Sequence, residues 1–213
     1  MKKTLYSLML SEDVVREVDA LARREGTNRS QLVNRILAEY VGLPTPERRI
    51  DDIFRRMEQL LLGDRELVPY AAPNATTLSL KSSLQYRYRP TVKYSVELFR
   101  DRSGAAGELS VLFRTQSVEL LGAMENYFRT LKAIEDALLC PALPIEYTLC
   151  GGRFTRSIRL DEAANDSADT VAAAISAYVR LFDALMKACL AGADRAVLAS
   201  RYRAWLDAGN MCI

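Results

Sequence analysis

The chain of 213 residues contains no histidine. Imidazole is a common general base and metal ligand in proteins, so its absence excludes histidine-based catalytic triads and histidine–carboxylate metal sites. Acidic residues sit mostly on expected helix faces beside lysine or arginine, a pattern typical of solvated faces. No nucleophile–base pair and no carboxylate cluster at functional spacing is present. We therefore expect no enzyme, no cofactor and no bound metal.

Cysteine is scarce and is not paired in the sequence. The spacing of the four cysteines fits neither a disulfide framework nor a zinc site, so we expect buried thiols. They are Cys140, Cys150, Cys189 and Cys212.

An excess of charge and a long apolar run are both missing. The formal net charge is +2, so any affinity for a polyanion must come from a local surface. The apolar runs are far shorter than the ~20 residues of a membrane span, and no small-residue cleavage site follows the apolar N-terminal stretch. We expect a cytoplasmic chain that makes no membrane contact. With 49% hydrophobic residues, the chain has enough apolar side chains to bury a core.

The first 45 residues show three patterned segments. Residues 3–10 alternate in a way that predicts a strand, and Ser11 then caps a helix that Gly26 ends. Asn28 caps a second helix, which ends at Gly42. The order is strand, helix, helix.

This unit resembles the ribbon–helix–helix family, the Arc/MetJ/CopG type of small bacterial DNA-binding protein. The resemblance rests on LMLSEDV at 8–14, LARREG at 21–26 and NRSQLVNR at 28–35. It implies a dimer in which the strands of two chains pair into one antiparallel ribbon. Such a ribbon fits the major groove of double-stranded DNA, while helix N-termini beside it bind phosphates.

The resemblance also assigns roles to individual positions. Base contacts fall to Ser7 and Met9, together with Lys3 and Leu5. Phosphate contacts fall to Asn28, Arg29 and Ser30. The shared dimer core is expected from the apolar positions of all three elements: Tyr6, Leu8, Leu10, Val14, Val18, Leu21, Leu32, Val33, Ile36 and Leu37.

The rest of the chain predicts a second, α+β domain. A helix from about residue 47 to 62 and an irregular link occupy residues 46–76. From residue 77 the pattern predicts an antiparallel sheet with two closing helices, in the order βββαββαα over 77–213. Gly151-Gly152 predicts a hairpin turn. Outward-facing Lys81, Gln85, Arg87, Arg89 and Lys93 are interpreted as a solvated sheet face.

The expected function is a sequence-specific transcriptional regulator, a repressor, with an N-terminal DNA-binding and dimerisation domain (1–45). The second domain would serve oligomerisation, as in a pair of dimers, or the sensing of an effector whose nature the sequence does not indicate. One alternative is an antitoxin that neutralises a partner toxin. Another is a ribbon that dimerises but no longer binds DNA, because the outward face of residues 5, 7 and 9 is apolar where the family usually has polar or basic residues.

Overall fold

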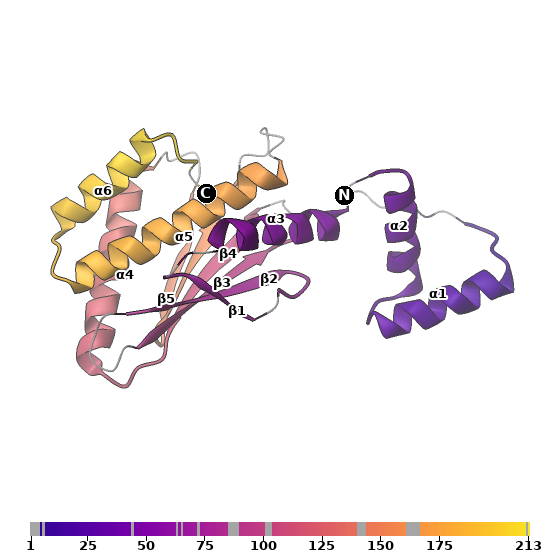
Figure 1. Cartoon of the computed structure of the whole chain (residues 1–213), viewed down its shortest axis with the longest axis horizontal. Helices are drawn as coiled ribbons and strands as arrows, with labels where there is room; N and C mark the ends of the chain where they lie inside the picture. Colours follow the sequence, from indigo (N-terminus) through magenta and orange to yellow (C-terminus); the bar gives the residue numbers. More distant parts are fainter. Residues whose placement is uncertain are drawn as a thin grey trace. The chain divides into compact units, whose positions relative to one another are not determined.

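The computed structural model describes residues 5, 7–43, 45–62, 64, 66–71, 73–84, 90–100, 104–139, 144–160, 167–211 and 213. The chain divides into two compact units, residues 1–49 and 50–213. Figure 1 shows the elements of each.

The first unit is built from α1 (Glu12–Arg24) and α2 (Arg29–Tyr40). Ser11 is the N-cap residue of α1, as the sequence predicts. Both helices end in a glycine with positive φ, Gly26 at 66° and Gly42 at 71°. At each end the amides of the glycine and of the residue after it bind carbonyls of the last turn, in a Schellman motif. The two predicted helices are therefore confirmed.

The predicted strand has no counterpart in the described part of the single chain. Residue 5 and residues 7–10 carry no helix or strand assignment, and positions 3 and 6 lie outside the described residues. A ribbon strand finds its hydrogen-bond partners in a second chain, which a single chain cannot supply.

Helix α3 (Pro46–Leu61) crosses the division between the two units. The Thr45 hydroxyl accepts the Arg48 amide at 3.2 Å, and Pro46 follows at the first helical position, where its missing N–H costs nothing. One face of α3 is buried in the core of the second unit: Ile50, Ile53, Phe54, Met57 and Leu61.

The second unit folds around one antiparallel sheet of six strands in the order β1-β2-β3-β4-β6-β5. Its elements after α3 are β1 (Val68–Ala71), β2 (Thr77–Ser83), β3 (Thr91–Leu98), β4 (Gly107–Phe113), α4 (Val118–Leu138), β5 (Tyr147–Cys150), β6 (Arg153–Ile158), α5 (Ala168–Leu190) and α6 (Arg195–Asp207). The predicted α+β class is confirmed, and five of the six strands follow the predicted order.

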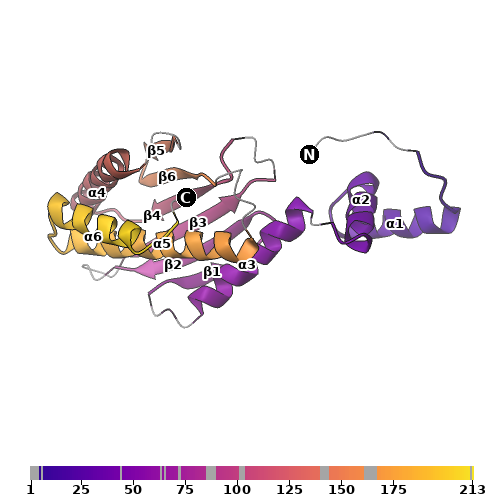
Figure 2. The same ribbon diagram turned by 90° about the horizontal axis from the view of Figure 1, so that it is seen from above.

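The two faces of the sheet differ sharply. In Figure 2, α3 and α5 lie over one face, and α4 joins them by stacking Phe128 on Phe154 of β6 at a ring-centroid distance of 4.5 Å. Apolar side chains line this face in cross-strand rows, one of which is Leu80, Tyr94, Val111, Phe154 and the half-buried Leu149. The opposite face carries a row of hydroxyl side chains: Ser79, Ser95, Ser110, Thr155 and Thr148.

Strand β1 lies in the segment that the sequence assigns to an irregular link. All four of its residues are exposed, and a bulge between Pro69 and Ala71 interrupts its pairing with β2. An edge strand of this kind lacks the alternation of buried and exposed positions on which strand prediction depends. The Gly151-Gly152 turn is confirmed, with φ of 55° and 76° joining β5 to β6. Cys150 is exposed and Cys189 half-buried, so the expectation of buried thiols is wrong for Cys150; the other two cysteines lie outside the described residues.

A carboxylate is buried where α4 meets α5, α6 and two strands of the sheet. Glu135 of α4 is 0% exposed and accepts hydrogen bonds from tyrosines of three other elements, Tyr147 of β5, Tyr178 of α5 and Tyr202 of α6. It also forms an ion pair with the equally buried Arg156 of β6 at 3.0 Å. One carboxylate thus holds five elements together, and the expectation that acidic residues are solvated fails here.

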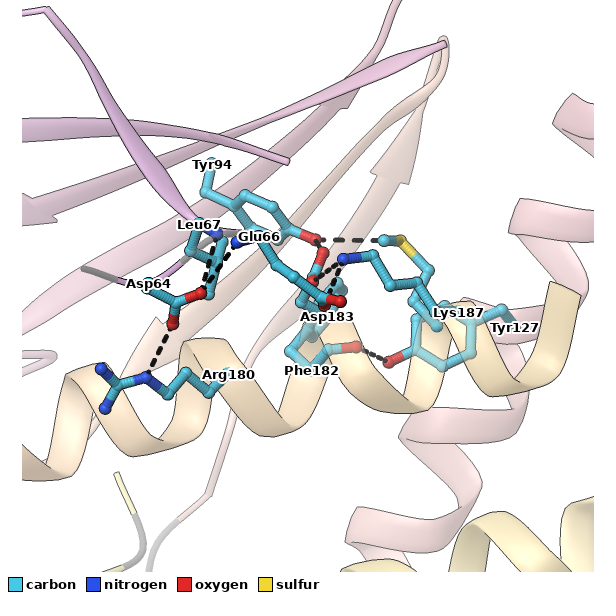
Figure 3. A network of polar contacts seen from close by, with 10 residues as sticks. Asp64, Glu66, Leu67, Tyr94, Tyr127, Arg180, Phe182, Asp183 and Lys187 are labelled. Atoms are coloured by element: carbon cyan, nitrogen blue, oxygen red, sulfur yellow. Dashed lines mark hydrogen bonds and ion pairs between the residues drawn. The ribbon is translucent and has the colours of Figure 1, made fainter. Parts of the chain in front are cut away.

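A second polar network joins α5 to strand β3 and to the segment between α3 and β1 (Figure 3). Asp183 accepts the Tyr94 hydroxyl at 2.6 Å and pairs with Lys187 at 2.6 Å. Lys187 reaches Glu66 at 2.7 Å. Although desolvation opposes it, hydrogen bonding to Asp183 and Glu66 raises the pKa of the Lys187 ammonium. The segment that joins α3 to β1 is therefore held against α5 by charged contacts.

Candidate nucleic-acid interface

The start of α2 is shaped by its capping residues. The Asn28 side chain accepts the amide of Gln31 at 2.9 Å. The Gln31 side chain pairs with the Thr27 hydroxyl at 2.8 Å rather than completing a capping box. Asn28 therefore uses its side-chain oxygen to cap the helix, and its role in phosphate binding stays a prediction.

Two backbone amides remain available at this helix terminus. Among the described residues, the N–H groups of Arg29 and Ser30 have no hydrogen-bond partner. Both residues are exposed, and both lie at the positive end of the α2 dipole. Paired free amides at a helix N-terminus are a suitable arrangement for a phosphate oxygen.

The guanidinium of Arg29 already has a partner within the chain. Its Nε donates to Asp19 Oδ1 at 2.6 Å, and its Nη2 binds the other carboxylate oxygen, so α1 and α2 are joined by a two-point ion pair. This hydrogen bonding with Arg29 lowers the pKa of Asp19 and raises the pKa of Arg29. Asp19 is the residue of this region that sequence analysis missed. Its position in α1 carries no signal of the contact, which depends on how the two helices cross.

The predicted base-contacting positions that the structure describes are exposed to solvent. Leu5 is 97% exposed, and Ser7 and Met9 are also exposed, while Lys3 lies outside the described residues. Leu8 and Leu10, on the other side of the same segment, are exposed as well. The single chain therefore leaves both sides of this segment uncovered.

The predicted dimer-core residues are only partly buried within one chain. Leu32 is fully buried, and Val18, Leu21 and Val33 are intermediate. The remaining described members of the set are exposed large apolar side chains: Leu8, Leu10, Val14, Ile36 and Leu37. Tyr6 lies outside the described residues. The apolar stripe also continues past the predicted set into Tyr40, Val41 and Leu43, which are exposed too.

The described residues of the second unit contain neither a metal-binding cluster nor a membrane-spanning helix. Within the described ranges, no group of three or more cysteine, aspartate or glutamate residues is arranged to hold a metal ion. No helix in the described part of the chain is both long and apolar enough to cross a membrane. The buried titratable groups Glu135 and Asp183 are engaged with tyrosines, an arginine and a lysine of the core.

The comparison with family models identifies the first unit. Residues 7–44 match the model described as ribbon-helix-helix protein, copG family. No curated protein and no solved structure matches the chain. The matched segment contains both capped helices, their glycine ends, and the Arg29 and Ser30 amides. Residues 7–44 are therefore a ribbon–helix–helix module of the copG type.

Proposed function

We propose that this protein is a dimeric, sequence-specific DNA-binding regulator, and that it represses transcription. The match over residues 7–44 supports a DNA-binding transcription regulator or an antitoxin. It supports no enzymatic role. In this proposal the protein acts as a homodimer that reads the major groove.

The observation that carries the proposal is the uncovered apolar surface of the first unit. Within residues 7–43, the large apolar side chains exposed include Ile36 at 41% and Leu37 at 48%, whereas the hydrophobic residues fully buried there are Ala22 and Leu32. An isolated unit would therefore leave most of its apolar surface in water. A second copy, paired through the same segment, would cover this surface and supply the missing strand partner.

The same dimer would bind DNA through two kinds of contact. The ribbon would bring Lys3, Leu5, Ser7 and Met9 to base edges, where methionine and leucine can contact thymine methyl groups. The α2 N-terminus, with Asn28, Arg29 and Ser30, would bind a phosphate and fix the register on the duplex. We propose that it acts in the cytoplasm of a bacterium, where its DNA target would lie.

For residues 77–213, with the helix and linker of 46–76, we propose a role in oligomerisation or sensing. The surface that supports this role is the polar face of the sheet, which carries the hydroxyl row of Ser79, Ser95 and Ser110. Pairing of these faces would join two ribbon dimers into a pair of dimers.

DNA binding is tested with two kinds of variant, one expected to lower the affinity for every sequence and one expected to change the preferred sequence. Arg29→Ala should weaken binding to every sequence, because a cation is lost and Asp19 is left unpaired beside the phosphate. The salt dependence should flatten by ~1 phosphate equivalent per subunit, or about two per dimer. Met9→Ala and Ser7→Ala should instead change the preferred sequence, by ~1–3 kcal/mol where a base contact is lost.

The measurement is fluorescence anisotropy over a salt series, with a site selected from random DNA and a scrambled duplex. If the wild type does not distinguish the two duplexes and Arg29→Ala changes nothing, the ribbon serves dimerisation alone. A small protein that co-purifies with the chain and is released by unfolding it would favour the antitoxin.

A further inference from the structure

Asp19 places an acidic side chain beside the helix terminus to which the proposed function assigns a phosphate. Its carboxylate faces the guanidinium of Arg29, the first residue of α2, through two hydrogen bonds. The Asp19 side chain is 25% exposed and the Arg29 side chain 53%, so the pair is accessible from solvent.

An ion pair of this kind lowers the affinity of a site for anions. Phosphate affinity grows with the positive charge that is free to neutralise it. Arg29 is the only cation among the three residues assigned to phosphate, and Asp19 opposes its charge at hydrogen-bond distance. The free amides and the α2 dipole remain. The guanidinium uses its Nε and Nη2 edge on Asp19, so Nη1 is left to face an incoming phosphate.

We propose that Asp19 limits the affinity of the DNA interface by offsetting the positive charge of Arg29. Asp19 thereby keeps the sequence-independent part of binding weak. This inference rests on the proposed DNA-binding function. Phosphate contacts carry no sequence information, so weakening them lowers non-specific binding and leaves discrimination to the base contacts.

The chain contains a matched control for this effect. Glu25, the C-cap residue of α1, forms a second ion pair with Arg35 of α2, with the same separation of ten residues along the chain. Arg35 lies six residues further into α2, or about 9 Å along the helix axis from the free amides. Glu25→Gln removes an ion pair that also joins the two helices, through one hydrogen bond, and it releases a cation away from the proposed phosphate site.

The experiment compares Asp19→Asn and Glu25→Gln with the wild type in the full chain. Binding to a selected duplex and to a scrambled duplex is measured between 50 and 200 mM salt. Asp19→Asn should bind both duplexes more tightly and should steepen the salt dependence by up to about two phosphate equivalents per dimer. The ratio of the Asp19→Asn affinity to the wild-type affinity should fall by up to about tenfold from the lowest to the highest salt concentration. Glu25→Gln should stay close to the wild type.

The possible results of this experiment distinguish the inference about Asp19 from the proposed DNA-binding function on which it rests. If the wild type binds DNA and Asp19→Asn binds more weakly, Asp19 orients Arg29 for the phosphate and the inference is wrong. If both variants lose the same small amount of thermal stability and neither changes its DNA affinity, Asp19 serves only to join α1 and α2. That result would also overturn the inference. If neither the wild type nor Asp19→Asn binds any duplex, the proposed function fails and the inference fails with it.

Discussion

The two units of this chain treat their apolar residues in opposite ways. In the second unit, one continuous cluster buries residues from α3, the sheet, α4, α5 and α6. In the first unit, Ala22 and Leu32 are the hydrophobic residues of 7–43 that are fully buried, and a stripe of larger ones remains in contact with water. The second unit resembles a domain that is complete in one chain, whereas the first resembles part of a core that is shared between chains.

The ion pairs of the two units also differ in burial. The two ion pairs between α1 and α2 are partly exposed, and exposed pairs contribute little to stability. In the second unit, Glu135 and Arg156 are completely buried, and three tyrosine hydroxyls complete the coordination of the carboxylate. Burial raises the pKa of Tyr178 well above its usual value, so this hydroxyl remains a donor at any physiological pH. The buried cluster requires a fixed core around it, and the exposed pairs do not.

The largest effect should come from cutting the chain on either side of α3. The fragment 45–213 keeps the helix and its cap and should melt cooperatively. The fragment 64–213 loses five buried apolar side chains, which at ~2 kcal/mol each is comparable to the whole stability of a domain. Circular dichroism melts of the two fragments make the test. Equal cooperativity would mean that α3 is not part of this core.

A smaller effect should come from removing one exposed valine in each unit. Val14 of α1 is 46% exposed and Val118 of α4 is 83% exposed. If a second chain covers Val14, Val14→Ala should weaken the dimer by about 1–2 kcal/mol per subunit. Val118→Ala should stay within about 0.5 kcal/mol of the wild type.

Analytical ultracentrifugation over a dilution series measures both valine variants. Equal dissociation constants for the two would argue against a shared core in the first unit.

The smallest effect concerns acid and the segment between α3 and β1. Although desolvation opposes it, hydrogen bonds from the Glu66 amide, from Arg180 and from the Leu67 amide lower the pKa of Asp64. A carboxylate with a lowered folded-state pKa stabilises the fold above its unfolded pKa, and this contribution is lost as the pH falls through the folded value. The melting temperature of the wild type should therefore exceed that of Asp64→Asn at pH 6, and the difference should shrink below about pH 4.

Arg180→Gln serves as the partner control for Asp64, since it removes one of the donors that lower the pKa. It should reproduce part of the same pH dependence in thermal melts. A difference between wild type and Asp64→Asn that stays constant from pH 6 to pH 3 would contradict the proposed linkage.

The local signals of the sequence were sufficient for most elements. Asn28 and the glycines at 26 and 42 marked the helix ends of the first unit because capping depends on neighbouring residues alone. The paired glycines at 151 and 152 marked the hairpin for the same reason. Strand β1 was missed because its four residues are all exposed.

The contacts between distant residues could not be predicted. Glu135 lies four residues after Leu131, on the apolar face of α4, and the partners that allow a carboxylate to be buried there come from α5, α6 and the sheet. The pair of Asp19 and Arg29 likewise depends on the crossing of two helices. The assignment of residues to base and phosphate contacts came from the family resemblance, and it stays a prediction.

The short connection between the two units has a consequence for local concentration. Residues 41–45 separate the end of α2 from the start of α3, and this stretch spans at most about 20 Å. In a dimer formed through the first units, the two second units would therefore be tethered at an effective concentration on the order of millimolar. A polar sheet face that is too weak to join two free chains would then join two such dimers more readily, because each dimer presents two copies of the face at once. Dissociation of the first units would remove this advantage.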